Sequence, residues 1–194
     1  GGYYTTEYDL VHSQKGIGDK ADHPWEESRG IGTSYGYNRF ETTKHYLSSK
    51  RLIDILIDKV TNGGNFLLNI GPDATGMIPV VMQERLLDIG KWLKVNGDAI
   101  YSSQPWRSPN KPKEGNLHFT RKDGNLYIIL KKWQKDPIIL TGLKSAGKAE
   151  LLGYKGDLKS TLQQGKLTIT LPQLTVDELP CEHAWVIKVT NFAE

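Results

Sequence analysis

The segment NFLLNI, residues 65–70, constrains the fold more than any other part of the sequence. Its apolar residues would lie on both faces of a strand, which is typical of a buried parallel strand. Apolar residues at helical spacing predict one helix before it, over 48–62, and another after it, over 79–97. The order helix, strand, helix across 48–97 is typical of an α/β fold.

The sequence after Trp106 has a different pattern. Short segments of alternating or apolar residues follow one another, and Gly, Pro or Asp separates most of them. Two of these segments flank the dipeptide Asp123-Gly124, which predicts a hairpin. Roughly seven short strands in about ninety residues predict an all-β sandwich. We place the boundary near Ser102 to Pro109, which gives domains 1–105 and 106–194.

Residues 1–40 are rich in Gly, Tyr and Ser and poor in aliphatic residues. They predict a short strand followed by long loops, in a stretch too polar to form core. Long irregular loops inside a compact domain are often functional.

Composition argues against several function classes. A net charge of +3 is too small to indicate a nucleic acid or a membrane surface as partner. The basic stretch 106–135 has eight Lys or Arg but two acids, and we interpret it as a solvated face. Cys181 is the single cysteine, which excludes a disulfide framework within the chain. No pair of histidines has metal-binding helical spacing, so we expect no metal site. No apolar run approaches the roughly 20 residues of a transmembrane helix, so we expect no membrane-spanning segment.

Three further features have a structural and a functional interpretation. The spacing of the glycines in GIGTSYG, residues 30–36, does not fit a dinucleotide fingerprint, and a loop packed on a sheet end is favoured. Asn69, at the end of its strand, could face a site or hydrogen-bond the following turn, and we favour the turn. Trp133 could stack on a sugar or belong to an interface between the two domains, and we favour the interface.

Glu7 is the candidate for acid/base chemistry. It stands at the end of a Tyr- and Thr-rich strand, YYTTEY. Aromatic neighbours limit water around a carboxyl group and favour its protonated form, as a general acid requires. An exposed rim residue is equally compatible with this spacing. Glu26 and Glu27, after Trp25, are competitors on the same grounds.

Several motifs occur in an order that resembles a known family. They are YTTEY at 4–8, PWE at 24–26, RGIGTSYGYN at 29–38, VTNGGNFLLNIGPDATGMIP at 60–79 and ERLLDIGKWLKVNGDAIY at 84–101. Together they resemble the α-L-fucosidases of glycoside hydrolase family 29. The resemblance is strong over residues 1–105, and the remainder is similar in its β-rich character.

The resemblance implies a fold, a reaction and partners. The fold would be the last units of a (β/α)8-like catalytic barrel followed by a β-sandwich. The reaction would be hydrolysis of terminal α-L-fucosyl linkages with retention and without a cofactor. The partners would be a fucosylated oligosaccharide or glycoconjugate and the N-terminal part of the same enzyme, and the substrate suggests a periplasmic, secreted or lysosomal-type location.

The resemblance also implies site residues. Glu7 matches the acid/base glutamate of a TxEY motif, and Tyr35 and Trp25 would contact the substrate. The nucleophilic aspartate of the family precedes the TxEY segment, so we expect this chain to be a C-terminal part that is inactive alone. The rival hypothesis is a non-catalytic carbohydrate-binding sandwich that uses the face around Trp133.

Overall fold

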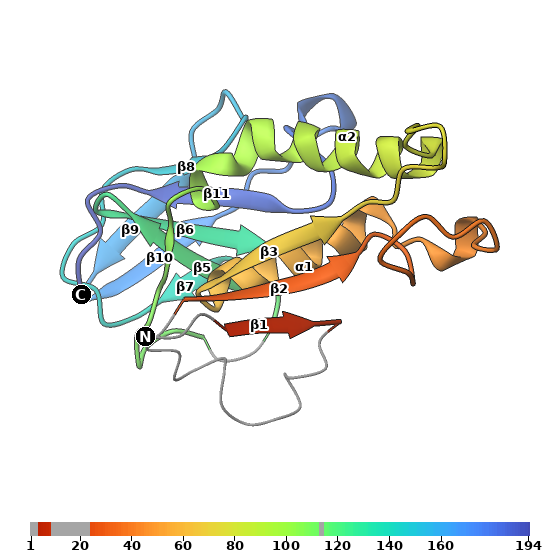
Figure 1. Ribbon diagram of the computed structural model, residues 1–194. Coiled ribbons are helices and arrows are strands. Elements are labelled where there is room, and N and C mark those ends of the chain that lie inside the picture. The colour runs from red at the N-terminus through yellow and green to blue at the C-terminus, as the bar shows by residue number, and fades with distance from the viewer. Residues whose placement is uncertain (1–3, 9–23, 113–114) are drawn as a thin grey trace. The chain divides into compact units, whose positions relative to one another are not determined.

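A computed structural model describes residues 4–8, 24–112 and 115–194. The chain divides into two compact units, Gly1–Lys91 and Trp92–Glu194, and the division falls inside helix α2 (Figure 1). The described part of the first unit contains one sheet and that of the second contains two, and each unit has its own hydrophobic cluster. The domain boundary predicted near residue 105 stays a prediction.

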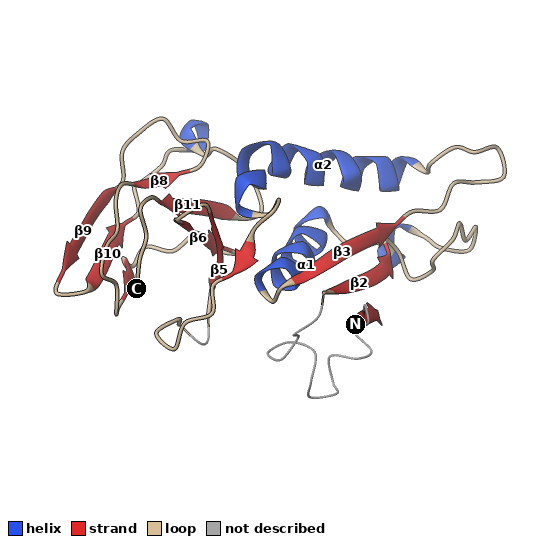
Figure 2. Cartoon of the chain, turned by 60° about the vertical axis from the view of Figure 1, so that its left-hand side comes forward, coloured by secondary structure: helices blue, strands red, loops and turns tan. Residues whose placement is uncertain are grey.

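The first unit is built on a parallel sheet with strand order β1-β2-β3. The strands are β1 Tyr4–Glu7, β2 Trp25–Gly30 and β3 Gly64–Asn69, and Figure 1 shows them side by side and pointing the same way. Helix α1, Ser49–Thr61, packs against β3 (Figure 2). The sequence therefore contains an alternation of helix and parallel strand, as predicted from the periodicity of 48–97.

Helix α1 begins and ends as its sequence predicts. The Ser48 side chain caps the first turn by accepting a hydrogen bond from the Arg51 N–H at 3.2 Å. Gly63 follows the C-cap Asn62 with a φ of 86°, which a residue with a side chain rarely adopts. Leu52 lies on the buried face and packs in one cluster with Ile31.

Helix α2, Val80–Asn96, is fixed to the start of α1 by side chains of its first half. The Ser49 hydroxyl donates to Asp88 Oδ2 at 2.6 Å, and Arg85 Nε donates to the Leu47 carbonyl at 3.1 Å. A short 3-10 helix, η1 Thr43–His45, precedes α1.

Strand β2 corrects the prediction that residues 1–40 form one strand and loops too polar for core. Trp25, Glu27 and Ile31 are almost completely buried. The prediction failed because WEESRG has no alternation of apolar and polar residues. Its buried face includes a carboxylate, and hydrophobic patterning does not detect a strand of that kind.

That carboxylate, Glu27, is fully buried and lies between two other elements. The Thr6 hydroxyl of β1 donates to Glu27 Oε2, and Lys59 Nζ of α1 lies 3.8 Å from the same oxygen. Lys59 is itself buried. Removing one partner of a buried ion pair costs about 3–5 kcal/mol, because the other charge then remains without compensation. The three residues therefore hold β1, β2 and α1 together.

The second unit is a sandwich of two antiparallel sheets, as predicted. The five-stranded sheet has the order β4-β5-β6-β11-β8, with β4 Gln104–Pro105, β5 Leu117–Lys122, β6 Asn125–Leu130, β11 Trp185–Val189 and β8 Ala149–Leu151. The three-stranded sheet has the order β7-β10-β9, with β7 Ile138–Leu140, β10 Lys166–Thr170 and β9 Lys159–Gln163. A short 3-10 helix, η3 Val176–Glu178, precedes β11.

The inner faces of both sheets contribute to one core. Phe119 and Ile128 of the larger sheet and Leu167 and Ile169 of the smaller one belong to the same buried cluster. Asp123 and Gly124 form the β5–β6 turn with φ angles of 50° and 73°, so the predicted hairpin is confirmed.

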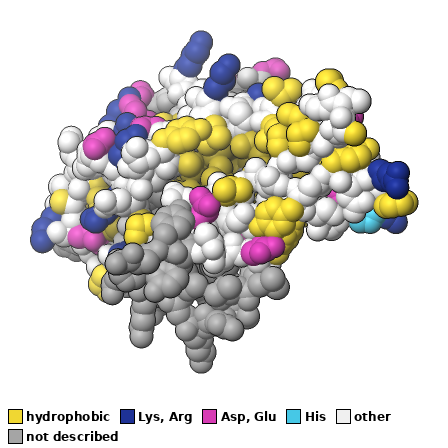
Figure 3. Space-filling model, viewed as in Figure 1, with side chains coloured by type: hydrophobic (Ala, Val, Ile, Leu, Met, Phe, Trp, Pro, Cys, Tyr) yellow, Lys and Arg dark blue, Asp and Glu magenta, His cyan; other side chains and the backbone are white. Residues whose placement is uncertain are grey.

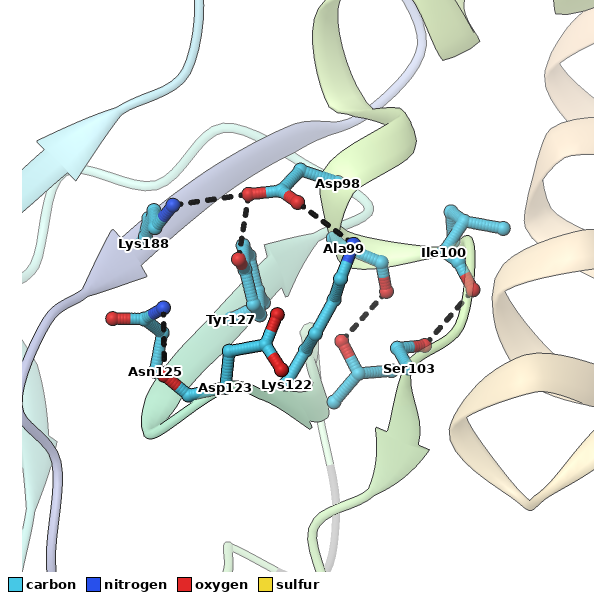
Figure 4. A network of polar contacts seen from close by, with 10 residues as sticks. Asp98, Ala99, Ile100, Ser103, Lys122, Asp123, Asn125, Tyr127 and Lys188 are labelled. Atoms are coloured by element: carbon cyan, nitrogen blue, oxygen red, sulfur yellow. Dashed lines mark hydrogen bonds and ion pairs between the residues drawn. The ribbon is translucent and has the colours of Figure 1, made fainter.

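A polar cluster ties the 3-10 helix η2, Gly97–Ala99, to the larger sheet. The Tyr127 hydroxyl donates to Asp98 Oδ2 at 2.6 Å, Lys188 Nζ lies 3.0 Å from the same oxygen, and Lys122 Nζ lies 3.1 Å from Oδ1 (Figure 4). The Tyr127 hydrogen bond and the two ammonium groups outweigh burial and lower the pKa of Asp98 to about 2. Burial and the Asp98 carboxylate raise the pKa of Tyr127 to about 12.

We predict that Asp98→Asn lowers the free energy of unfolding by about 1 kcal/mol at pH 7. The expected loss of stability is small because the Asp98 side chain is 42% exposed and water screens its contacts. The folded pKa lies below the ordinary value of 3.8, so the contribution is present above pH 3.8 and disappears as the pH falls toward 2. Urea unfolding at several pH values measures it.

The matched control is Asp157→Asn. The Asp157 carboxylate pairs with Lys148 at 3.2 Å but is 85% exposed, so its loss should change stability little. An Asp98→Asn protein that is as stable as the Asp157→Asn protein at pH 7 would contradict the interpretation.

Candidate active site

The carboxyl ends of the three parallel strands bring Glu7 to one edge of the sheet. Glu7 ends β1 and is in register with Ser28 of β2, while Gly30 of β2 is in register with Asn69 of β3. Residues that pair across parallel strands point to the same face. Glu7, Ser28 and Asn69 therefore share one face of the sheet, and Thr6 and Glu27 share the other.

The two faces have different environments. The face of Thr6 and Glu27 is the one that Lys59 of α1 contacts. On the face of Glu7 the side chains are exposed or half-buried, and Leu67 there is 43% exposed. In the described part of this unit, α1 therefore covers the Glu27 face, and Glu7 lies on the accessible one.

Tyr35 reaches this face from the loop after β2. Its hydroxyl donates to Ser28 Oγ at 3.0 Å, next to the position of Glu7 in the register. Its ring packs edge-on against Tyr8, with ring centroids 5.3 Å apart. The Tyr8 hydroxyl accepts a hydrogen bond from the Gly30 N–H at 3.0 Å. Tyr35 is thus held at the strand ends by contacts with two neighbouring strands.

The loop that carries Tyr35 packs closely on the sheet end. Asn69 donates a side-chain hydrogen bond to the Tyr35 carbonyl, and its own carbonyl accepts from the Ile31 N–H at 3.0 Å. A side chain on Gly71 would overlap the backbone of Gly36 and Tyr37. The interpretation of the glycine-rich segment as a loop packed on a sheet end is confirmed. The favoured interpretation of Asn69 was wrong, because its side-chain amide binds this loop and not the turn that follows its own strand.

Glu41 fixes the same loop from its far side. Its Oε1 accepts from the Thr33 N–H at 2.9 Å and from the Thr33 hydroxyl at 2.5 Å. Burial acts to raise the pKa of Glu41, but hydrogen bonds from Thr33, Ser34 and Tyr46 outweigh it and lower the pKa. Glu41 is therefore a charged acceptor that orders the backbone two residues before Tyr35.

The structure separates the three candidate acids. Glu7 is exposed, Glu26 is half-buried on the same face, and Glu27 is buried on the opposite face with Thr6 and Lys59. Glu27 holds the fold together and has no access to a substrate here. The roles of Glu7 and Glu26 stay predictions.

Trp25 begins β2 and is completely buried. A side chain on Gly64, its partner in β3, would overlap the Trp25 ring. This burial gives Trp25 a packing position within the sheet. Its predicted contact with substrate stays a prediction that no described contact supports.

Sequence reasoning did not identify Ser28, Tyr8 and Glu41 as part of this region. Tyr8 directly follows Glu7 in the sequence, and this position could have identified it as part of the region. The sequence contained no signal for Glu41, because its contact with Thr33 depends on how the loop folds back.

The part of the chain that the structure describes, residues 4–8, 24–112 and 115–194, bears on the expected absence of a metal site and of a membrane span. There, no three His, Cys, Asp or Glu side chains lie close enough together to hold a metal ion, and no helix is long and apolar enough to cross a membrane. Trp133 packs against the core of the sandwich and contacts Trp185 edge-on, with centroids 5.5 Å apart.

Comparison with known proteins identifies the family. The α-L-fucosidase family model matches residues 2–98, and the α-L-fucosidase C-terminal domain matches residues 110–190. The chain belongs to the α-L-fucosidases of glycoside hydrolase family 29. The resemblance noted from the motifs is therefore confirmed.

Individual α-L-fucosidases are similar over nearly the whole chain. The α-L-fucosidase of Branchiostoma floridae is 36% identical over 97% of this chain and 42% of its own length. The human tissue α-L-fucosidase is 38% identical over 98% of this chain and 41% of its own. A crystal structure of Thermotoga maritima α-fucosidase with a mechanism-based inhibitor superimposes with a TM-score of 0.76 at 34% identity, over 97% of this chain and 42% of that one. The chain thus spans about two fifths of the length of these α-L-fucosidases.

We predict that Glu41→Ala loosens the loop that carries Tyr35. Loss of a charged acceptor should increase hydrogen exchange of the Thr33 amide about tenfold or more. Glu41→Gln should retain much of the protection, because its amide oxygen can still accept. NMR-detected exchange on the 194-residue chain measures the effect. Glu84→Ala on the exposed side of α2 is the control, and equal Thr33 exchange in both alanine variants would refute the role of Glu41.

Proposed function

We propose that this chain is the C-terminal part of a retaining α-L-fucosidase that hydrolyses terminal α-L-fucosyl linkages of glycans. The observation that carries the proposal is the position of Glu7, exposed at the carboxyl end of a parallel strand in a chain of this family. Active sites of β/α barrels lie at this end of the strands. Fucosylated oligosaccharides or glycoconjugates are the proposed substrates.

Glu7 is the proposed acid/base. In the first step it protonates the glycosidic oxygen of the leaving group, while a second carboxylate attacks the anomeric carbon. In the next step it removes a proton from the water that releases fucose. Retention requires the two carboxyl groups about 5 Å apart. We propose that the nucleophile comes from the N-terminal part of the same enzyme, which is the partner of this chain.

Tyr35 is the proposed wall of the sugar site. Fucose has an apolar methyl group at C6, and an aromatic ring provides a matching apolar surface. The hydrogen bond to Ser28 and the edge-on contact with Tyr8 fix the orientation of the Tyr35 ring. Trp25 is buried in β2, the strand that carries Ser28. We propose that its packing supports the sugar site by holding this strand in position.

The first unit is proposed to be the last part of a (β/α)8-like barrel. Parallel sheets are normally covered on both faces. The accessible face that carries Glu7 would then be the barrel interior. Apolar side chains are also exposed around α2 and the loop before it, including Val80 at 70% and Leu87 at 65% (Figure 3). Exposed apolar surface of this kind supports the proposal that other parts of the enzyme cover it.

We retain the domain division 1–105 and 106–194. The two family matches support it, because the first ends at residue 98 and the second begins at residue 110. A periplasmic, secreted or lysosomal-type location is proposed from the substrate class, and one relative is named a plasma α-L-fucosidase.

We predict that Glu7→Gln, made in the native protein that contains this chain, lowers kcat on a fucosyl disaccharide by about 10²–10⁴-fold. A poor leaving group needs a proton, so an activated aryl α-L-fucoside should be affected less in its first step. Azide should restore turnover and give a fucosyl azide with the anomeric configuration of the substrate. Rate measurements with and without azide provide the test.

The matched control is Glu26→Gln, because Glu26 lies on the same face of the neighbouring strand. It should retain most of the activity. Azide rescue of Glu26→Gln alone would assign the acid/base to Glu26. A native protein that hydrolyses no α-L-fucoside would overturn the proposed function itself.

For Tyr35 we predict a larger effect on KM than on kcat. Tyr35→Ala removes the apolar wall and should raise KM for the aryl fucoside about tenfold or more. Tyr35→Phe keeps the ring and loses the bond to Ser28, so its KM should lie between the wild-type and alanine values. Equal KM values for all three proteins would show that Tyr35 does not contact the sugar.

A further inference from the structure

The sandwich contains an open cavity of about 430 Å³ that the proposed hydrolysis does not use. It lies between the start of β4, the β5–β6 hairpin and the segment Phe192–Glu194. Its volume is within the usual range of about 300–1,000 Å³ for small-molecule sites. All the lining residues belong to the second unit.

The lining presents both signs of charge. Lys122 is neutralised by Asp98, because its Nζ lies 3.1 Å from that carboxylate. Arg121 Nη2 makes a long contact of 3.4 Å to Gln104 Oε1, and no carboxylate among the described residues pairs with it. Asp123 and Glu194 add acidic groups to the same lining. These carboxylates would repel an anionic ligand, even though the Arg121 guanidinium could bind one.

The cavity also has an aromatic side that is fixed in place. The Phe192 ring packs edge-on against the buried Trp106, with centroids 5.6 Å apart. The Phe192 N–H donates to the Gly124 carbonyl at 2.9 Å, which joins this segment to the hairpin turn. Phe192 is partly buried and still lines the cavity.

The hairpin that carries the polar groups is ordered before any ligand binds. The turn at Asp123-Gly124 has the positive φ angles of a tight hairpin, and Asn125 donates to the Asp123 carbonyl at 3.3 Å. Figure 4 shows Asp123 and Asn125 on this turn, next to Lys122 and the Asp98 cluster. A preorganised site loses less conformational entropy when it binds.

We propose that this cavity is a non-hydrolytic binding site for a neutral pyranose ring of a glycan. Sugar hydroxyls both donate and accept hydrogen bonds, so they match a lining that combines a guanidinium, carboxylates and amides. The apolar face of a sugar ring can pack on Phe192. A mixture of Arg121, Asp123, Gln104 and Asn125 around one aromatic ring suits a polyhydroxylated neutral ligand better than a phosphate or a sulfate.

The experiment uses the ¹⁵N-labelled 194-residue chain and NMR titration. The probes are methyl α-L-fucopyranoside, methyl β-D-galactopyranoside, methyl β-D-glucopyranoside and inorganic sulfate. We expect at least one of the three sugars to shift the amide signals of Gly124 and Asn125. We expect Arg121→Ala and Asp123→Asn each to weaken that binding about tenfold or more, as loss of a hydrogen bond to a charged group does.

The matched controls are Lys155→Ala and Asp136→Asn, two exposed positions outside the cavity lining. Both should bind the sugar as the wild type does, and near-UV circular dichroism checks that every variant is folded. Glu7→Gln should also bind normally, which separates this site from the proposed active site. The proposal is overturned if no sugar binds, if sulfate binds in place of the sugars, or if sugar binding survives both cavity variants or is lost in Glu7→Gln.

Discussion

The buried carboxylate of Glu27 is the interaction on which the first unit depends. It accepts a hydrogen bond from Thr6 and lies close to the Lys59 ammonium, so it joins two strands and a helix at a point closed to water. A charge at such a site is stable only while its partners are in place. The position of Glu7 follows from this contact, because Glu7 is the next residue after Thr6 and points to the opposite face.

A second acid, Asp98, has a comparable role in the sandwich but in a different environment. It is partly exposed and gathers Tyr127, Lys122 and Lys188 around one carboxylate. The low pKa of Asp98 keeps the carboxylate charged under ordinary conditions. Glu27 and Asp98 both connect elements distant in sequence, whereas Glu41 connects two parts of one loop. Acidic side chains therefore organise much of the described part of this molecule.

How far the sequence predicted the structure depended on where the apolar residues lie. Helix α1 follows a regular helical periodicity and strand β3 is a short apolar run, and both were predicted, as was the hairpin at Asp123-Gly124. Strand β2 was missed because a buried ion pair takes the place of apolar residues on its inner face. Of the candidate site, Glu7 and Tyr35 could be named from motifs, whereas the contacts of Ser28 and Glu41 arise from loop folding that has no periodic signal.

Strand β1 has four residues, and its pairing with β2 could in principle shift along the chain. A shift of one position would exchange the faces of every side chain. Glu7 would then point toward the Lys59 side, and Thr6 would move to the accessible face. In that alignment Thr5 would take the place of Thr6 beside Glu27, but the Glu7 carboxylate would become a second acid on the closed face, where an uncompensated charge is costly. The observed alignment avoids the burial of this second charge, so the register of one short strand decides which face receives the acid.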